Sequence, residues 1–453
     1  MGRLLLLMTT NTYRAGAFLE AAGRLGVPIV VGSDRPQILA AANPGGHLAV
    51  NFETPDEGVH TIVEFSRKYP IDAILAADDE GVILAAAASA ALGLPHNTPE
   101  AVASARDKYR MRQALAQAGI PTPRFRRVPI DADPAEAARE VSFPCVLKPL
   151  SLAGSRGVIR ADNPREFAVA FRRVEAILRQ PEVATQVGEP SRHVLVEDFI
   201  PGREVALEGL LSHGRVRVLA LFDKPDPLDG PFFEETIYVT PSRLPAAIVE
   251  GITARTAEAL KALGLRHGPI HAELRVNDQG AWIIEIAPRS IGGLCSRALR
   301  FGDGISLEEL ILHHALGSHV ESLERESQAA GVMMIPIPEA GILRDIQGRR
   351  EAEGVRGIEE IRLTIPVGHE LVPPPEGARY LGFIFARGQS PGCVEDSLRE
   401  AHRALAFVIT PPGDMAMSQD AGVSTGARER EGQSAKPARS RRAVVAGASR
   451  RSQ

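Results

Sequence analysis

The stretch HAELRVNDQGAWIIEIAPRSIGG, residues 271–293, has the pattern of two apolar β-strands joined by a short turn. Each strand carries one glutamate, Glu273 and Glu285, among apolar neighbours. Burying a carboxylate in an apolar strand costs free energy unless a cation or a hydrogen-bond donor compensates it. The hairpin therefore indicates a site at which two carboxylates are held by other groups of the chain.

The register of this hairpin decides whether the two carboxylates meet. If the loop is the three residues 278–280, counting outwards places Glu273 directly opposite Glu285. Residues so paired have Cβ atoms about 4.5–5.5 Å apart, and two ionised carboxylates at that distance repel unless they share a proton or a cation. A two-residue loop would instead place Ile284 opposite Glu273.

A pair of oxygen ligands favours a hard cation, Mg²⁺ or Mn²⁺, over zinc. Glu273 and Glu285 are therefore predicted metal ligands. Alternation along the strand keeps Arg289 on the face of Glu285 where the strand stays extended. The alternative is that one glutamate pairs with Arg275 while the other is exposed. His271, beside Glu273, is open to a substrate or phosphate contact and equally to a structural role.

Composition excludes several classes of protein. The 52 Lys+Arg against 56 Asp+Glu give a net charge of −4, which excludes a globally basic nucleic-acid binder, and 5% aromatic residues disfavour base-stacking surfaces. Cys145, Cys295 and Cys393 are widely spaced, which indicates a reduced compartment and no thiolate metal site. The first apolar run, Leu4–Met8, is too short for a signal-peptide core, and no run approaches a membrane span of about 20 residues. A cytoplasmic protein is predicted.

The chain divides into four predicted parts. Residues 1–104 alternate near-continuous apolar strands with helices, which predicts an α/β domain with a parallel sheet. The absence of GxGxxG after the first strand disfavours a dinucleotide site. Residues 105–320 are strand-rich α+β sequence, and residues 321–411 predict a small α+β domain. Residues 412–453 are predicted to be a disordered basic tail, either a solvated terminus or an arm for an anionic partner.

The segment FPCVLKPLSLAGSRGV, residues 143–158, places Lys148 in an apolar strand before a flexible loop. The loop contains small residues, Ser151, Gly154, Ser155 and Gly157. A strand lysine beside such a loop suits a nucleotide triphosphate, with the ammonium and backbone N–H groups on phosphate oxygens. The segment lacks the GxxxxGK[ST] pattern of a P-loop, and a surface lysine before an ordinary loop fits equally well.

A second candidate nucleotide contact is VLVEDFIPGREVALEG, residues 194–209. Its apolar strand ends in Glu197, Asp198, Phe199 and Ile200 before a Pro-Gly turn. Such a strand end can offer backbone N–H and C=O groups to an adenine, with Glu204 near a ribose. The alternative is a strand end whose acidic side chains are solvated.

These motifs occur in a particular order: Lys108 in RDKYRMRQAL, Lys148 in VLKP, the loop SLAGSRGV, VEDFIPGREV, and then two glutamates 12 residues apart. That order resembles the ATP-grasp superfamily, in which two α+β lobes clamp ATP with Mg²⁺. The resemblance covers roughly residues 1–320, and its specificity lies in the ordered set of motifs.

The resemblance implies a role for each nucleotide-binding candidate. Lys108 and Lys148 would contact the ATP phosphates, and the loop 151–158 would close over them. Residues 197–200 would form the adenine hinge, and Glu204 would bind the ribose.

The resemblance also implies the metal and the chemistry. Glu273 and Glu285 would hold Mg²⁺ or Mn²⁺, and Arg289 would stabilise the reacting carboxylate. The superfamily's usual reaction phosphorylates a carboxylate and lets a nucleophile, commonly an amine, attack the acyl phosphate. Cations, metal and a closing loop are what such a phosphoryl transfer requires.

The branch of the superfamily is read from several segments. Ala287 in EIAPR replaces the asparagine of the E-x-N-x-R pattern of biotin-carboxylase-like members, which argues against that branch and leaves the number of metal ions open. EIAPR is also similar to the aminoimidazole ribonucleotide carboxylase branch, but SIGGLCSRAL follows it here. The whole stretch 271–293 most resembles the dipeptide-forming L-amino acid ligases.

Two further segments support that branch. Residues 222–245 resemble a substrate-lining segment of such ligases, with a Gly/Pro-rich surface loop as the alternative, and residues 331–409 resemble their C-terminal domain. If residues 222–245 line the substrate, Glu234 or Glu235 would meet its ammonium group.

The predicted function is an ATP-dependent carboxylate–amine ligase for amino acid-like substrates, with ATP and Mg²⁺ or Mn²⁺ as cofactors. Its partners would be small-molecule carboxylates and amines. The alternative is an ATP-grasp carboxylase that uses bicarbonate. A non-catalytic nucleotide-binding scaffold, or a structural protein with a basic arm, is disfavoured by the intact set of lysines and acids. By analogy with the superfamily alone, the chain would form a homodimer.

Overall fold

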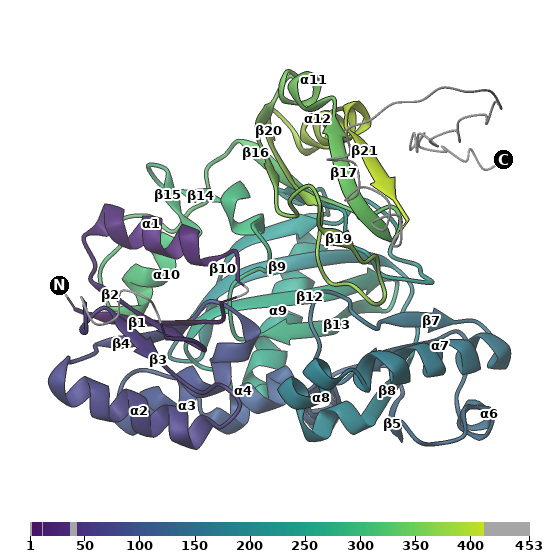
Figure 1. Cartoon of the computed structure of the whole chain (residues 1–453), viewed down its shortest axis with the longest axis horizontal. Coiled ribbons are helices and arrows are strands. Elements are labelled where there is room, and N and C mark those ends of the chain that lie inside the picture. Colours follow the sequence, from purple (N-terminus) through teal and green to yellow (C-terminus); the bar gives the residue numbers. More distant parts are fainter. Residues whose placement is uncertain (1, 11, 37–42, 412–453) are drawn as a thin grey trace, which may run out of the picture.

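The structure is a computed structural model that describes residues 2–10, 12–36 and 43–411 (Figure 1). The predicted basic tail, residues 412–453, lies outside the described residues.

The chain begins with a four-stranded parallel sheet in the order β3-β2-β1-β4. Its strands are β1 (Leu4–Met8), β2 (Ile29–Ser33), β3 (His47–Ala49) and β4 (Ala73–Ala76). Leu4 and Leu6 share a core with Phe18, while Leu5 and Leu7 pack with residues of α2 and α3. Because both faces are covered, β1 is apolar at every position, as the sequence predicted. The helices of this part are α1 (Ala15–Leu25), α2 (Pro55–Lys68), α3 (Val82–Leu92) and α4 (Pro99–Arg106), with the 3₁₀ turn η1 (Asp79–Gly81).

A four-stranded antiparallel sheet follows, in the order β5-β8-β6-β7. Phe167, Phe171 and Val174 of α7 are buried against it, which gives this lobe its own core. Its elements are β5 (Phe125–Pro129), β6 (Cys145–Pro149), β7 (Ile159–Ala161), β8 (His193–Asp198), α6 (Pro134–Ala137), η2 (Ala138–Glu140), α7 (Pro164–Leu178), α8 (Pro181–Val187) and η3 (Glu189–Arg192).

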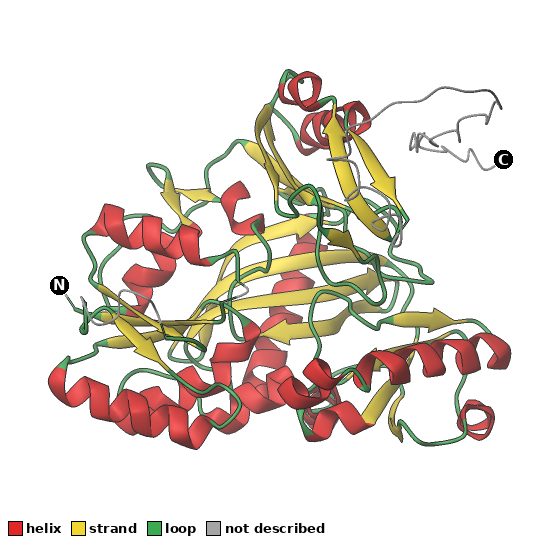
Figure 2. Cartoon of the chain, in the orientation of Figure 1, coloured by secondary structure: helices red, strands yellow, loops and turns green. Residues whose placement is uncertain are grey.

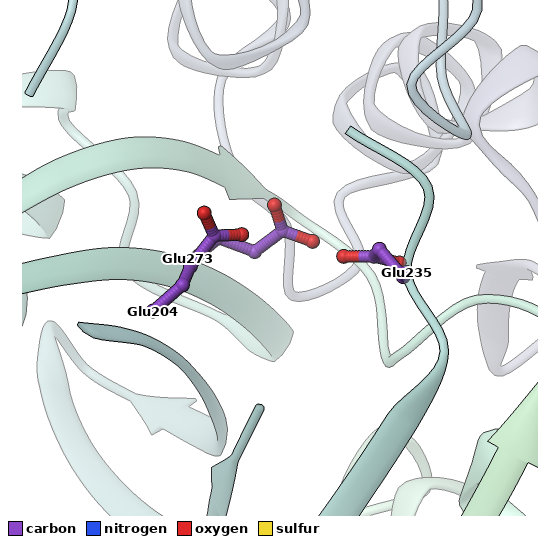
Figure 3. A group of neighbouring side chains, drawn as sticks. All are labelled: Glu204, Glu235 and Glu273. Carbon is purple, nitrogen blue, oxygen red and sulfur yellow. The ribbon is translucent and has the colours of Figure 1, made fainter. Parts of the chain in front are cut away.

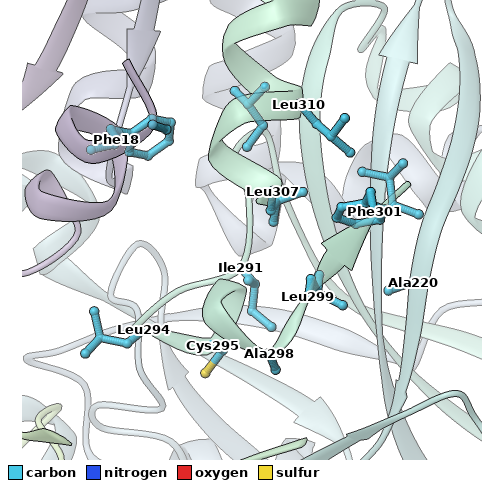
Figure 4. Packing of buried hydrophobic residues seen from close by; sticks show 14 of the residues in the cluster. Phe18, Ala220, Ile291, Leu294, Cys295, Ala298, Leu299, Phe301, Leu307 and Leu310 are labelled. Atoms are coloured by element: carbon cyan, nitrogen blue, oxygen red, sulfur yellow. The ribbon is translucent and has the colours of Figure 1, made fainter. Parts of the chain in front are cut away.

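An eight-stranded antiparallel sheet crosses the middle of the molecule (Figure 2). In spatial order its strands are β13 (Gly280–Ala287), β12 (Gly268–Asn277), β9 (Arg203–Ser212), β10 (Arg215–Asp223), β11 (Ile237–Thr240), β16 (Ala329–Ile335), β20 (Gly382–Gly388) and β18 (Ile358–Leu363). One part of it packs against α5 (Lys108–Gln117) and α9 (Ala246–Leu263). Another core joins it to α10 (Leu307–Ala315) and the N-terminal sheet, through Phe18, Phe301 and Leu310 (Figure 4).

The C-terminal part adds a three-stranded sheet in the order β19-β17-β21. Its elements are β17 (Gly341–Gln347), α11 (Arg349–Glu353), β19 (Glu370–Leu371), α12 (Pro391–Ala404) and β21 (Ala406–Thr410). Before it stand the short η4 (Cys295–Ala298), β14 (Arg300–Phe301) and β15 (Ile305–Ser306). The eight-stranded sheet is continuous across the predicted boundary near residue 320, because β11 pairs with β16. The domain boundaries stay predictions.

The β12–β13 hairpin confirms one sequence-based prediction and corrects another. Glu273 lies directly opposite Glu285, as predicted. The loop, however, is the two residues 278–279 and not the predicted three, because Asn277 pairs with Gly280. Ile284 forms a β-bulge between the pairs Leu274–Ile283 and Glu273–Glu285. This extra residue shifts the register by one, so Glu273 pairs with Glu285 despite the shorter loop.

No helix in the described part of the chain is long and apolar enough to cross a membrane.

Candidate functional site

A cavity of about 2430 Å³ opens between the N-terminal part, the four-stranded lobe, the eight-stranded sheet and the C-terminal part. It brings together nearly all the residues singled out from the sequence. These are Lys108, Lys148, Ser151, Gly154, Ser155, Glu197, Asp198, Phe199, Ile200, Glu204, Glu273, Glu285 and Arg289. Gly157 is not among the described residues that line the cavity, and its N–H donates to the carbonyl of Pro375 at 2.8 Å.

Lys148 is buried in β6 and its ammonium lies 2.7 Å from a carboxylate oxygen of Glu197 on β8. The other oxygen of Glu197 accepts from Arg112, a fully buried residue of α5, at 2.7 Å. Burial alone would raise the pKa of Glu197, but Arg112 and Lys148 lower it to about 2. The carboxylate therefore stays ionised and fixes Lys148 at the cavity wall.

The backbone at the predicted adenine hinge is already partly hydrogen bonded. Asp198 and Phe199 donate their N–H groups to the carbonyls of Arg124 and Pro144, each at 3.0 Å. The carbonyl of Ile200 accepts from the guanidinium of Arg275 at 2.9 Å. All three residues line the cavity, and the hinge role stays a prediction.

Lys108 begins α5, and Asp107 caps that helix by accepting from the N–H groups of residues 109 and 110. The Lys108 ammonium lies 3.2 Å from Glu285 and 2.9 Å from the carbonyl of Leu152 in the glycine-containing loop. One lysine thus joins the helix, the loop and the β13 strand of the hairpin at the cavity.

The other hairpin glutamate belongs to a separate group of acids. Oxygens of Glu204, Glu235 and Glu273 lie within 4.8 Å of one another (Figure 3). The ammonium of Lys224, at the end of β10, lies 2.8 Å from Glu204, 2.5 Å from Glu235 and 3.5 Å from Glu273. The three carboxylates raise the pKa of Lys224 well above its usual value, against the effect of burial.

These carboxylates fit a hard divalent cation by their chemistry, because all three offer oxygen ligands. Glu285 lies outside this group of three and pairs with Lys108 instead. The two predicted metal ligands therefore belong to different groups of side chains. Burial alone would raise the pKa of Glu273, but Lys224 and His271 hold it below its usual range. The metal role of Glu273 and Glu285 stays a prediction.

Glu235 is the better placed of the two glutamates considered for a substrate ammonium. It lines the cavity, and it accepts a hydrogen bond from the hydroxyl of Tyr238 at 2.6 Å. Glu234 is not among the described cavity-lining residues; one of its carboxylate oxygens is buried without a described partner, and burial raises its pKa to about 7.

Arg289 lies beyond the end of β13 at Ala287, so strand alternation does not place it. Its guanidinium donates to Asp79 of the N-terminal part at 2.7 Å and to the carbonyl of Ser290 at 2.9 Å. Burial alone would raise the pKa of Asp79, but Arg289 and the other nearby cations, Arg106 and Lys108, hold it below its usual range. Arg289 is thus fixed by the N-terminal part at the cavity.

His271 is occupied by two carboxylates. Its Nδ1 contacts Glu208 and its Nε2 lies 3.2 Å from Glu273. Burial lowers the pKa of His271, but Glu208 and Glu273 raise it to about 9. Arg275 pairs with Glu204 at 2.9 Å and with neither Glu273 nor Glu285, so the alternative pairing considered for the hairpin is not formed.

Sequence reasoning missed Arg112, Lys224 and Asp79. Lys224 has a sequence context similar to that of Lys148, since each follows a largely apolar stretch and precedes a proline. Arg112 and Asp79 have no such signal, because their partners lie 85 and 210 residues away in the chain.

Comparison with known proteins matches three parts of this chain. A family model for the ATP-grasp domain matches residues 141–298, one for the ATP-grasp N-terminal domain matches residues 19–96, and one for the L-amino acid ligase C-terminal domain 2 matches residues 333–410. The solved L-amino acid ligase from Bacillus licheniformis superposes with a TM-score of 0.75 at 27% identity, over 90% of this chain and 99% of that one.

Two named relatives match a shorter part. Alanine–anticapsin ligase of Bacillus amyloliquefaciens is 28% identical over 57% of this chain and 56% of its own length. Dapdiamide A synthase of Enterobacter agglomerans is 30% identical over 57% of this chain and 61% of its own length. The match therefore spans less than two thirds of either relative.

Proposed function

We propose that this chain, which belongs to the ATP-grasp family of ATP-dependent ligases, joins the carboxylate of one amino acid-like substrate to the amine of another. The predicted reaction class, an ATP-dependent carbon–nitrogen ligase, is confirmed at the level of the family. The named relatives are an alanine–anticapsin ligase and a dapdiamide A synthase, which supports amino acid-like substrates for this chain as well.

The observation that carries the proposal is that one cavity collects two lysines, the glycine-containing loop and a group of three carboxylates. Lys108 and Lys148 line the cavity together with the 151–158 loop, where the phosphates of ATP would lie, and Lys108 contacts the carbonyl of Leu152 in that loop. Glu204, Glu235 and Glu273 gather on the eight-stranded sheet. One site thus offers ammonium groups for phosphate oxygens and carboxylates for a cation or a substrate ammonium, which a phosphoryl transfer to a carboxylate requires.

Different residues of the chain would bind the phosphates, the reacting carboxylate and the substrate ammonium. The two lysines would bind phosphate oxygens and stabilise the charge that develops on them, and Arg289 would bind the reacting carboxylate. Glu235 would bind the ammonium of an amino acid. A Mg²⁺ or Mn²⁺ ion held by Glu273 and Glu285 would supply further neutralisation of phosphate charge. The 151–158 loop would exclude water, to which an acyl phosphate would otherwise be lost.

Phosphate release from ATP tests the proposal, measured against a panel of single and paired amino acids with bicarbonate as a separate arm. We expect ADP, phosphate and an amide product in equal amounts with particular amino acid pairs. Release with bicarbonate alone would instead favour the carboxylase. If no arm released phosphate and calorimetry detected no ATP binding, the ligase function would be contradicted.

A further inference from the structure

A loop of the C-terminal part lines the cavity and contacts a second loop, residues 151–158, which is expected to cover the phosphates. We call residues 372–380, which connect β19 to β20, the strap, and residues 151–158 the glycine loop. In Figure 1 the strap extends from the C-terminal part towards the four-stranded lobe. None of the roles assigned so far involves the strap.

Two hydrogen bonds to backbone carbonyls of the strap hold it against the glycine loop. The N–H of Gly157 donates to the carbonyl of Pro375, and the guanidinium of Arg156 donates to the carbonyl of Glu376, each at 2.8 Å. A Cβ on Gly154 would meet Ala378 at 3.3 Å, so the two loops also touch closely at that point.

A bidentate ion pair holds the strap from the other side. Arg173 on α7 donates through Nε and Nη2 to the two carboxylate oxygens of Glu376, at 2.6 and 2.9 Å. The hydrogen bonds from Arg173 lower the pKa of Glu376, which keeps the pair charged. Paired donors of a guanidinium fix direction as well as distance.

Arg173 also contacts the segment that leads to the substrate side of the cavity. Its guanidinium lies 4.9 Å from the ring centre of Phe232, and Phe232 bridges to Ile159 just beyond the glycine loop. Three residues along the chain, Glu235 lines the cavity. Arg379 and Tyr380, at the end of the strap, line the same cavity.

We propose that Arg173 and Glu376 are positioning residues that latch the glycine loop in its closed place and tie that closure to the substrate side of the cavity. The latch would make loop closure and completion of the substrate pocket one event. Phosphoryl transfer to water in an incomplete site would thereby be suppressed. The kinetic consequence rests on the proposed function, whereas the structural latch does not.

The test compares Glu376→Gln and Arg173→Gln with Arg172→Gln as a matched control. Arg172 neighbours Arg173 on α7 but pairs with Glu175 of its own helix. Hydrogen exchange of residues 151–158, followed by mass spectrometry without nucleotide, should speed up roughly three- to tenfold in the two latch variants and not in the control. The charge-reversed double variant, R173E with E376R, should restore slow exchange. Unchanged exchange in both latch variants would overturn the latch.

Kinetics supply the second readout. In the latch variants we expect a higher KM for ATP, with kcat changed less, and more than one phosphate released per amide formed. A strict one-to-one ratio in variants whose loop exchanges faster would overturn the coupling. Faster loop exchange in a protein that shows no ligase activity with any substrate pair would leave the latch standing and count against the proposed function alone.

Discussion

Glu273 and Glu285 face each other across the β12–β13 ladder, yet each lies beside a different lysine. Lys224 lies 3.5 Å from Glu273, and Lys108 lies 3.2 Å from Glu285. Lys224 directly follows β10 of the eight-stranded sheet, and Lys108 begins α5. The hairpin therefore joins the group of three carboxylates to the part of the cavity where we propose that the phosphates of ATP lie.

Replacing Glu285 with Gln should abolish phosphoryl transfer while leaving the fold intact. The Glu285 side chain is 30% exposed, so its replacement by an isosteric amide is tolerated structurally. Loss of a metal ligand removes several kcal/mol of transition-state stabilisation, which lowers ADP formation by at least about 100-fold. Glu258→Gln, on the exposed face of α9, is the control. An active Glu285→Gln variant with unchanged Mn²⁺ affinity would remove the metal assignment.

Replacing Glu235 with Gln should weaken amino acid binding and leave ATP binding nearly unchanged. A buried hydrogen bond to a charged group contributes about 1.5–3 kcal/mol, so the KM for one amino acid should rise by roughly tenfold or more. Steady-state kinetics with each substrate varied in turn measures this. Equal effects on the KM values of ATP and of both substrates would show that Glu235 has no specific role in ammonium binding.

Replacing Glu197 with Gln should destabilise the protein. Glu197 is 3% exposed and lies between Arg112 and Lys148, so the change leaves buried cations without their anion, at a loss of about 3–5 kcal/mol. Asp198→Asn, which breaks only the exposed pair with Arg124, should cost much less, because solvent screens that pair. Urea unfolding of both variants makes the comparison, and equal losses would contradict the buried network.

The same network predicts a pH dependence. The pKa of Glu197 is about 2 in the folded protein, below its ordinary value of 4.5. A depressed carboxyl pKa adds stability that is present above pH 4.5 and is lost as the pH falls towards 2. Glu197→Gln should therefore flatten this acid limb of the stability profile, measured by urea unfolding between pH 2 and 6. An unchanged acid limb would count against the low pKa.

Glu234 should act in the opposite direction. Burial raises its pKa to about 7, so the folded protein holds a proton that the unfolded chain releases above pH 4.5. The stability tied to this proton is present below pH 4.5 and lost as the pH rises through 7. Glu234→Gln should stabilise the protein at pH 8 more than at pH 4.5, by thermal unfolding at both values. The reverse order would contradict a buried, raised carboxyl group.

The parts of the fold that were predictable depend on local patterns. The apolar run Leu4–Met8 is a buried parallel strand, and the alternation of strands and helices around it gives the N-terminal sheet. The Glu273–Glu285 pairing was predicted with the wrong loop length, and the bulge at Ile284 compensated the error. An extra residue shifts the alternation of polar and apolar side chains, and this shift cannot be recognised where both faces of the strand carry apolar residues.

Site residues could be predicted where a charged side chain interrupts an otherwise apolar strand. Lys148 and the two hairpin glutamates did so, and the cavity collects them. The partners that fix them could not be read from the sequence, because they meet only in the tertiary structure. Nothing in the sequence around Arg112 or Glu376 identifies its partner, because Glu197 and Arg173 lie far away along the chain.

The oxygen atoms of the substrate carboxylate test the central claim most directly. The pair of amino acids that supports phosphate release would be supplied with ¹⁸O in the reacting carboxylate, and the released phosphate would be analysed by mass spectrometry. Attack of the carboxylate on ATP moves one of its oxygens to phosphate when the amine displaces it, so we predict one ¹⁸O per phosphate. Unlabelled phosphate alongside full amide formation would contradict an acyl-phosphate ligase.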